Sequence, residues 1–154
     1  MAKQLFYDAI SVGQSLPVLV KHPTTRQLVM FAGAAEEFYE AHYDKDFAIS
    51  QGLPGVMVHG MLMTSFLGQL VTDWMGDEGT LKKFSCQYRA IDWPRQMKTQ
   101  PDPEDGETWL VKGKVTKKYQ EGNEHLVDCE IWVQNGKGEI TTPGKATVAL
   151  PSRG

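Results

Sequence analysis

The chain has 154 residues, of which 41% are apolar and 23% are charged, and its net charge at neutral pH is -3. This length and composition predict a single domain over residues 1–154 that buries its own core. The slightly acidic balance gives no general attraction to phosphate backbones or anionic lipid, so we expect neither nucleic acid nor a membrane as partner. Two cysteines and an N-terminus without an apolar signal segment favour a reducing cytoplasm.

The first half of the chain predicts an arm followed by helices. Residues 1–30 mix short apolar pieces with glycine and proline, which is typical of an arm with a short edge strand. Thr24 and Thr25 precede apolar residues at helical spacing, so we expect a helix that is capped there and ends near Tyr39. A second short helical turn is expected after residue 43, before the sequence GLPG turns the chain.

A longer helix is expected to start at about His59 and to run to Met75. Its apolar residues lie almost all round the helix, which predicts a buried element. The rest of the chain alternates apolar and polar residues over 81–91, 107–120, 124–134 and 138–150, with turn signals at 101–106, 121–123 and 135–138. This order predicts an α+β fold in which a curved antiparallel sheet wraps one long central helix.

Several chemistries lack their sequence motifs. The chain contains no GxGxxG, HExxH, CxxC or GxSxG, and the spacing of its four histidines is not typical of a metal site. We therefore expect neither a metal nor a resident cofactor. Cys86 and Cys129 fall in alternating strand segments, where a small buried thiol is the simplest interpretation.

Residues 31–76 combine an acidic and aromatic segment with a glycine-rich loop and the apolar helix, and they include the acid and base candidates Glu37 and His42. Taken alone, a glutamate on a polar helix face is usually solvated, and a lone histidine is usually a packed or surface residue. His59 could likewise cap the apolar helix, and Ser65 could donate a hydrogen bond to the carbonyl group one turn earlier.

The order of these elements resembles the MaoC-like, or (R)-specific enoyl-CoA hydratase, family of hotdog-fold proteins. The segments that carry the resemblance are FAGAAEEFYEAHYDKDFA and GLPGVMVHGMLMTSFLGQL, and YDAISVGQSLP is similar to that family's first strand. The resemblance covers nearly the whole chain, and the VHGM helix start is its more specific part. It implies a single hotdog fold, with a coenzyme A thioester as substrate.

The resemblance also implies roles for particular residues. The family's catalytic aspartate falls on Glu37 and its catalytic histidine on His42, while the glycine whose amide points at the thioester carbonyl falls on Gly60. We expect these three to be catalytic and a second set to bind substrate, namely Tyr39, His59, Met61, Ser65 and Arg89. Water addition to a 2-enoyl thioester needs an acid and a base around one water and donors to the thioester oxygen, and a helix N-terminus supplies such a donor.

The sequence departs from the family pattern at Glu36 to Glu40, where the family has Gly-Asp-x-Asn-Pro. Three functions therefore stay open: a hydratase or dehydratase acting on 2-enoyl or 3-hydroxyacyl thioesters of coenzyme A or an acyl carrier protein, a hotdog thioesterase, and a non-catalytic partner or acyl-CoA-binding subunit. A single hotdog leaves a sheet edge and one helix side open, so we expect a homodimer or larger homo-oligomer, or a heteromer with a second hotdog subunit. Basic residues near the strand that follows the helix are candidates for contacting coenzyme A phosphates, namely Lys82, Lys83, Arg89, Arg95 and Lys98.

Overall fold

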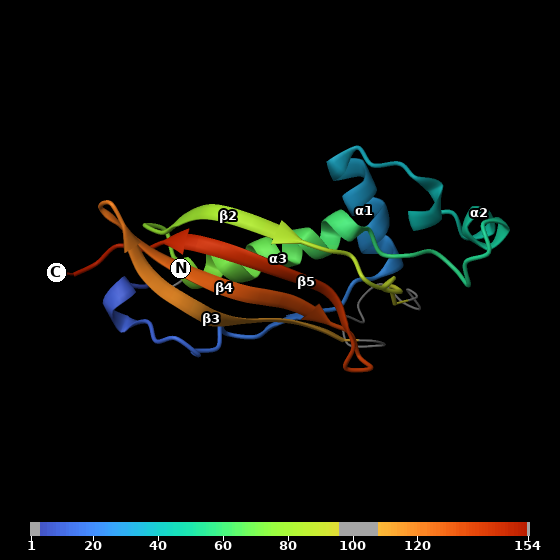
Figure 1. The fold of residues 1–154 in the computed structure, drawn as a ribbon. Helices are drawn as coiled ribbons and strands as arrows, with labels where there is room; N and C mark the ends of the chain where they lie inside the picture. The colour runs from blue at the N-terminus through green and yellow to red at the C-terminus, as the bar shows by residue number, and fades with distance from the viewer. Residues whose placement is uncertain (1–3, 96–107, 154) are drawn as a thin grey trace.

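A computed structural model describes residues 4–95 and 108–153. Its centre is a five-stranded antiparallel sheet with the strand order β1-β3-β4-β5-β2. The strands are β1 (Leu19–Lys21), β2 (Thr80–Cys86), β3 (Trp109–Glu121), β4 (Glu124–Gln134) and β5 (Ile140–Ala149). Figure 1 shows that the sheet curves around the longest helix.

The helices are α1 (Thr25–Ala35), α2 (Lys45–Ser50) and α3 (Gly60–Met75), with short 3-10 helices η1 (Tyr7–Ala9) and η2 (Glu40–His42). Helix α3 runs along one face of the sheet, whereas α1 and α2 lie beyond one end of it (Figure 1). No helix among the described residues is both long and apolar enough to cross a membrane.

The core lies between α3 and the sheet. The residues that α3 buries are Leu62, Met63, Phe66, Leu67, Leu70, Val71 and Trp74, and the strands contribute Val111, Val115, Val127, Cys129, Ile131, Val133, Ala146 and Val148. Most of the strand residues are β-branched, which suits a pleated surface packed on one face. Each fully buried side chain of this size contributes about 1.5–3 kcal/mol, so this contact is the main stabilising layer.

The α+β class and the central helix against a curved antiparallel sheet are confirmed, but the helix is not wrapped on all sides. Met61, Ser65, Gln69 and Thr72 are exposed along one stripe of α3. The sheet covers only the opposite side, since a single five-stranded sheet cannot close around a helix. The open stripe is the side of the helix that the sequence predicted to be free for oligomerisation.

Three predicted boundaries differ from the structure. The first helix ends at Ala35 rather than near Tyr39, because Glu36 adopts a left-handed conformation (φ 55°) and closes the helix. Residues 7–17 form no strand; they contain η1 and an isolated bridge at Ser15, and the first strand starts at Leu19. Strand β2 ends at Cys86 and not at residue 91, whereas the turn predicted at 101–106 lies outside the described residues.

Candidate active site

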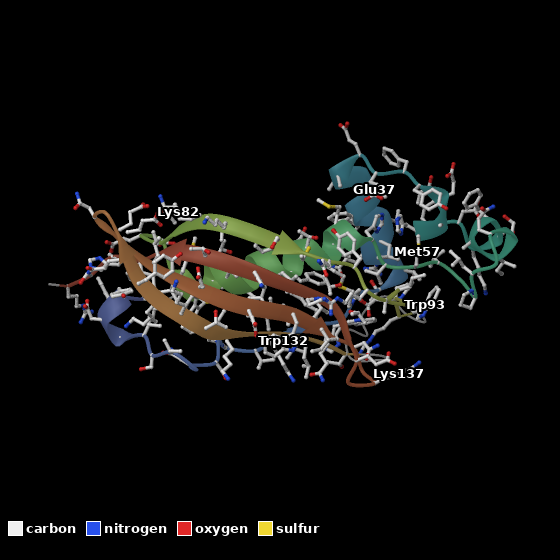
Figure 2. All side chains as sticks on the ribbon, viewed as in Figure 1. Glu37, Met57, Lys82, Trp93, Trp132 and Lys137 are labelled. Atoms are coloured by element: carbon white, nitrogen blue, oxygen red, sulfur yellow. The ribbon has the colours of Figure 1, made fainter. Side chains whose placement is uncertain are left out.

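Glu37 and His42 lie in the segment that joins α1 to α2, beyond the end of the sheet. The left-handed Glu36 turns the chain so that the Glu37 N–H donates to Ala32 O over 3.1 Å, which fixes Glu37 directly after the helix. His42 is the last residue of η2 and is buried. Figure 2 shows Glu37 and Met57 at this end of the molecule, far from Lys82 at the other end.

The two side chains approach each other closely: His42 Nε2 lies 3.5 Å from Glu37 Oε1. The other ring nitrogen of His42, Nδ1, lies 2.9 Å from the backbone carbonyl oxygen of Met57. A carbonyl only accepts hydrogen bonds, so Nδ1 carries the proton and the neutral ring presents its lone pair at Nε2, toward Glu37. The structure therefore brings together the two candidate acid–base residues, Glu37 and His42, within the span of one bridging water.

The ring of His59 stacks on the ring of His42. The two imidazole rings stack with centroids 3.8 Å apart and planes 20° apart, and Phe31 covers His59 edge-on at 4.9 Å. His59 is fully buried, and neither of its ring nitrogens has a hydrogen-bond partner among the described residues. Burial, together with the charge that His42 can carry, lowers the pKa of His59, while Glu37 opposes this effect.

Glu37, His42 and His59 each have an atom that could bind a metal ion, and these three atoms lie within 4.8 Å of one another. Imidazole nitrogens bind a metal through lone pairs that lie in the plane of the ring. Because the two rings are stacked nearly parallel with centroids 3.8 Å apart, their in-plane lone pairs cannot both reach one ion at about 2.0–2.1 Å, whereas the longer hydrogen bonds of a water can span the two rings. The arrangement therefore suits hydrogen bonding to small molecules better than metal coordination.

Gly60 begins α3, immediately after His59. A Cβ atom at Gly60 would lie 2.8 Å from the Tyr88 ring, so the absence of a side chain lets the tyrosine pack over the helix start. The Tyr88 hydroxyl lies 2.6 Å from Thr64 Oγ1. The N-terminal amides of a helix carry partial positive charge, so this end of α3 is suited to an oxygen that gains negative charge.

A cavity of about 280 Å³ opens at this helix start. It is lined by His42, Met57, Val58, Gly60, Met61, Met63, Tyr88, Ala90, Ile91, Asp92 and Thr142. His42 and the start of α3 thus face one space, which is otherwise mostly apolar. Glu37 and His59 are not part of its lining, so they lie beside His42 rather than in the cavity wall.

The other predicted substrate-binding residues lie in different surroundings. Tyr39 packs edge-on against His42 with ring centroids 5.7 Å apart, and the exposed Met61 lines the cavity. The Ser65 hydroxyl donates to Met61 O over 2.9 Å, which is the helical back-bond that the sequence left open as an alternative. Arg89 is exposed and donates to Gln87 Oε1 over 3.1 Å, beside a separate pocket over β4 and β5.

The basic residues considered for coenzyme A do not form one cluster. Lys82 pairs with Glu124, and Arg95 is buried with a nitrogen 3.1 Å from His22 Nδ1. Lys98 lies outside the described residues. Lys82, Arg89 and Arg95 therefore lie in three different environments, because β2 ends at Cys86, before Arg89 and Arg95.

Both cysteines lie on strands, as predicted, and neither forms a disulfide. Cys129 is buried in the core, where burial chiefly and the Asp128 charge secondarily raise the pKa of its thiol to about 12. A thiol with this pKa stays protonated at neutral pH, so Cys129 is a packing residue and not a nucleophile.

Three further residues belong to this region and were not predicted from the sequence, namely Met57, Tyr88 and Asp92. Met57 acts through its backbone carbonyl, which no side-chain pattern reveals. The buried Asp92 accepts from Trp109 Nε1 over 2.8 Å and from the Thr141 hydroxyl over 2.6 Å, and its backbone carbonyl accepts from the Val58 N–H. Asp92 thereby connects β3 and β5 to the loop before α3, a connection between segments far apart in the sequence.

The fold and the site together define a class: hotdog proteins that present a carboxylate and an imidazole at the start of the central helix. A profile of the MaoC like domain matches residues 10–93, which is more than half of the chain. The chain therefore belongs to the MaoC-like dehydratase family, which is a hydratase and dehydratase family.

Individual relatives agree with this family. The chain is 27% identical over 142 residues to the beta subunit of a 3-oxo-4,17-pregnadiene-20-carboxyl-CoA hydratase of Mycobacterium tuberculosis, covering 92% of this chain and 96% of that protein. A chain of the ChsH1–ChsH2 complex from the same organism has a similar structure (TM-score 0.74, 22% identity, 91% and 98% covered). So does an (R)-hydratase from A. caviae involved in PHA biosynthesis (TM-score 0.75, 23% identity, 93% and 98% covered).

Proposed function

We propose that this protein is a hydratase or dehydratase that interconverts 2-enoyl and 3-hydroxyacyl thioesters of coenzyme A or an acyl carrier protein. The observation that carries the proposal is the 3.5 Å approach of Glu37 to the free nitrogen of His42, beside a cavity that also exposes the start of α3. No resident cofactor is needed, because an acid, a base and a donor to the thioester oxygen are sufficient for this reaction.

In the hydration direction, the water oxygen forms a bond to C3 of the enoyl group and one water proton goes to a basic group of the pair. The electrons of the double bond move toward the thioester oxygen, which gains negative charge, and the pair then delivers the proton taken from the water to C2. The water is thus added as a proton and a hydroxyl group. The 3.5 Å separation of His42 and Glu37 lets the proton pass from one to the other before it reaches C2.

Gly60 is proposed to stabilise the thioester oxygen through its backbone N–H. The first amides of a helix have no partner within the helix, and they are therefore available to a ligand. A donor that is already in place costs no reorganisation when charge develops, and the loss of one such donor typically slows a reaction by about 100-fold to 1,000-fold.

The first test uses His42→Ala, Glu37→Gln and Glu37→Asp. Hydration of a 2-enoyl-CoA is followed by the loss of the ultraviolet absorption of the conjugated thioester. We expect His42→Ala and Glu37→Gln to lower kcat by about 100-fold to 10,000-fold while the circular dichroism spectrum is unchanged. If His42→Ala turned over substrate at the rate of the wild-type protein, the proposed roles would be refuted.

Glu37→Asp tests whether the longer acid suits this backbone. The aspartate carboxylate would withdraw from His42 by about one methylene, and a misplacement of about 1 Å can cost about 100-fold in rate. We therefore expect Glu37→Asp to be much less active than the unchanged protein, although aspartate is the residue to which the resemblance assigns this position. Equal or higher activity of Glu37→Asp would show that the Glu37 position is not adapted to glutamate.

A second candidate function, a subunit that works with another hotdog chain, is favoured by the similarity to a hydratase beta subunit. The exposed stripe of α3 and the edge strand β2 provide surface for either a second copy or a different subunit. Activity that appears only after co-purification with a second hotdog protein would support this candidate. Release of free coenzyme A, measured with a thiol reagent, would instead indicate a thioesterase, because hydration releases no thiol.

A further inference from the structure

His59 is the residue whose environment the proposed acid and base do not explain. Among the described residues, only His59 has buried side-chain nitrogen or oxygen atoms that lack a hydrogen-bond partner. Leaving a buried polar group unpaired weakens folding, and a phenyl ring would fill the space between Phe31 and His42 without that loss. The ring nitrogens of His59 therefore indicate a small polar partner.

The position of His59 identifies where this partner lies. Three atoms lie within 4.8 Å of one another: one ring nitrogen of His59, one ring nitrogen of His42 and one carboxylate oxygen of Glu37. Nδ1 of His42 is bonded to the Met57 carbonyl, so Nε2, 3.5 Å from Glu37 Oε1, is the nitrogen of His42 that is free for a water. Two groups that each bond one water at about 2.8 Å lie about 4.6 Å apart. Ligand atoms that are all within 4.8 Å of one another are therefore close to the spacing around a single water.

We propose that His59 is a third hydrogen-bond partner of the reacting water, in addition to Glu37 and His42. This inference rests on the proposed function and adds a residue to its chemistry. A neutral imidazole has one N–H and one lone pair, so His59 can donate to the water oxygen while the water donates hydrogen bonds to Glu37 and His42, one of which takes a proton as C3 is attacked. The oxygen lone pair that attacks C3 would then be oriented by three groups instead of two.

The same geometry indicates that His59 does not contact the acyl group. His59 is not part of the cavity lining and is fully buried, so the acyl chain does not reach it. A water is small enough to occupy the space beside His42, and buried waters typically make about three hydrogen bonds. The sequence-based assignment of His59 to substrate binding thus becomes an assignment to the water.

The test compares His59→Phe with His59→Gln, and uses His125→Phe as the matched control. Phenylalanine keeps a flat ring but removes both nitrogens, whereas glutamine keeps an N–H donor. His125 also contacts an aromatic ring, that of Tyr7 at 4.8 Å, but lies on β4 outside the site. We expect His59→Phe to lower kcat at least about tenfold and His59→Gln to retain more activity. We expect His125→Phe to keep the original kcat.

Stability separates this role from a purely structural one. Because His59→Phe keeps the ring that packs between Phe31 and His42 and gives up only a hydrogen bond to one water, its Tm should be nearly unchanged while its kcat falls, and its affinity for a saturated acyl-CoA should be unchanged. A folded His59→Phe variant with the original kcat would overturn the proposal. So would a variant whose Tm and acyl-CoA affinity fall together with kcat, since that result indicates a packing role.

A crystal structure that resolves ordered waters provides a readout independent of activity and of variant folding. The proposal expects one water within hydrogen-bond distance of His59, Glu37 and His42 in the unchanged protein. A water that contacts Glu37 and His42 but not His59, or no water there, would overturn it. If the protein hydrates no 2-enoyl thioester, the proposed function fails by itself, while the crystal structure still decides whether His59 holds a water.

Discussion

Glu36 is the one residue other than glycine among the described residues with a positive φ, at 55°. This conformation normally favours glycine, because a Cβ atom is crowded there at a cost of about 1–2 kcal/mol. The resemblance to the family assigns a glycine to this position, and the structure gives the reason: the turn that presents the next residue, Glu37, to His42 requires a left-handed backbone.

We therefore expect Glu36→Gly to increase the free energy of unfolding by about 0.5–1 kcal/mol, since relief of the crowding exceeds the entropy that glycine adds to the unfolded chain. Urea denaturation measures this change. Glu40→Gly, which replaces a residue at the start of η2 where φ is not positive, is the control and should destabilise the protein. A loss of stability in Glu36→Gly would show that Glu36 is not strained.

Among the elements, the start of α3 has the closest packing at the site. Tyr88 comes from the segment after β2, and its ring would lie 2.8 Å from any Cβ atom at position 60. Gly60 thus has two separate roles: its amide is the proposed donor to the thioester oxygen, and its missing side chain admits the tyrosine ring. A loss of activity in Gly60→Ala would not by itself distinguish these two roles.

The pair Gly60→Ala and Tyr88→Ala distinguishes them. If the alanine acts only by displacing the Tyr88 ring, removing that ring in the double variant should restore the kcat of Tyr88→Ala alone. We expect this outcome, because an alanine leaves the position 60 amide in place, and the single Gly60→Ala variant should lose at least about tenfold in kcat from displaced groups. Strictly additive losses in the double variant would contradict coupling between the two residues.

For the whole molecule, His59 links stability to pH. Burial chiefly, and the charge on the stacked His42, lower the pKa of His59 in the folded state, while the Glu37 carboxylate opposes the shift. The unfolded chain binds a proton at this residue near pH 6.5, but the folded protein does not until the pH is lower. The folded state is thus disfavoured as the pH falls below about 6.5, and the full stability is present above it.

We expect the free energy of unfolding of the unchanged protein to fall between pH 7.5 and pH 5.5 more steeply than that of His59→Phe. The difference in slope should be no more than about 1.4 kcal/mol per pH unit, the limit for one proton. Urea denaturation at several pH values measures it, and His125→Phe should not remove this part of the slope. Parallel curves for the unchanged protein and His59→Phe would show that His59 titrates alike in both states.

The class of the fold, the positions of most elements and the nearness of Glu37 to His42 could be predicted from the sequence. These features are local: a capping Thr24, helical spacing and strand alternation act over a few residues, and the pair lies within one short segment. The sequence did not determine that Glu36 ends the first helix, because leaving the helix at a non-glycine residue is unfavourable locally.

The contacts that complete the site could not be predicted from the sequence and are seen only in the folded protein. The Met57 carbonyl is hydrogen-bonded to His42, and the ring of His59 stacks on the ring of His42. Tyr88 packs over Gly60. Arg89 lines a different pocket from the one at the start of α3. The physical reason is that these contacts join segments whose separation in the sequence carries no periodic signal. They require α3 to be packed on the sheet. They also require the loop before α3 to be joined to β3 and β5 through the hydrogen bonds of the buried Asp92.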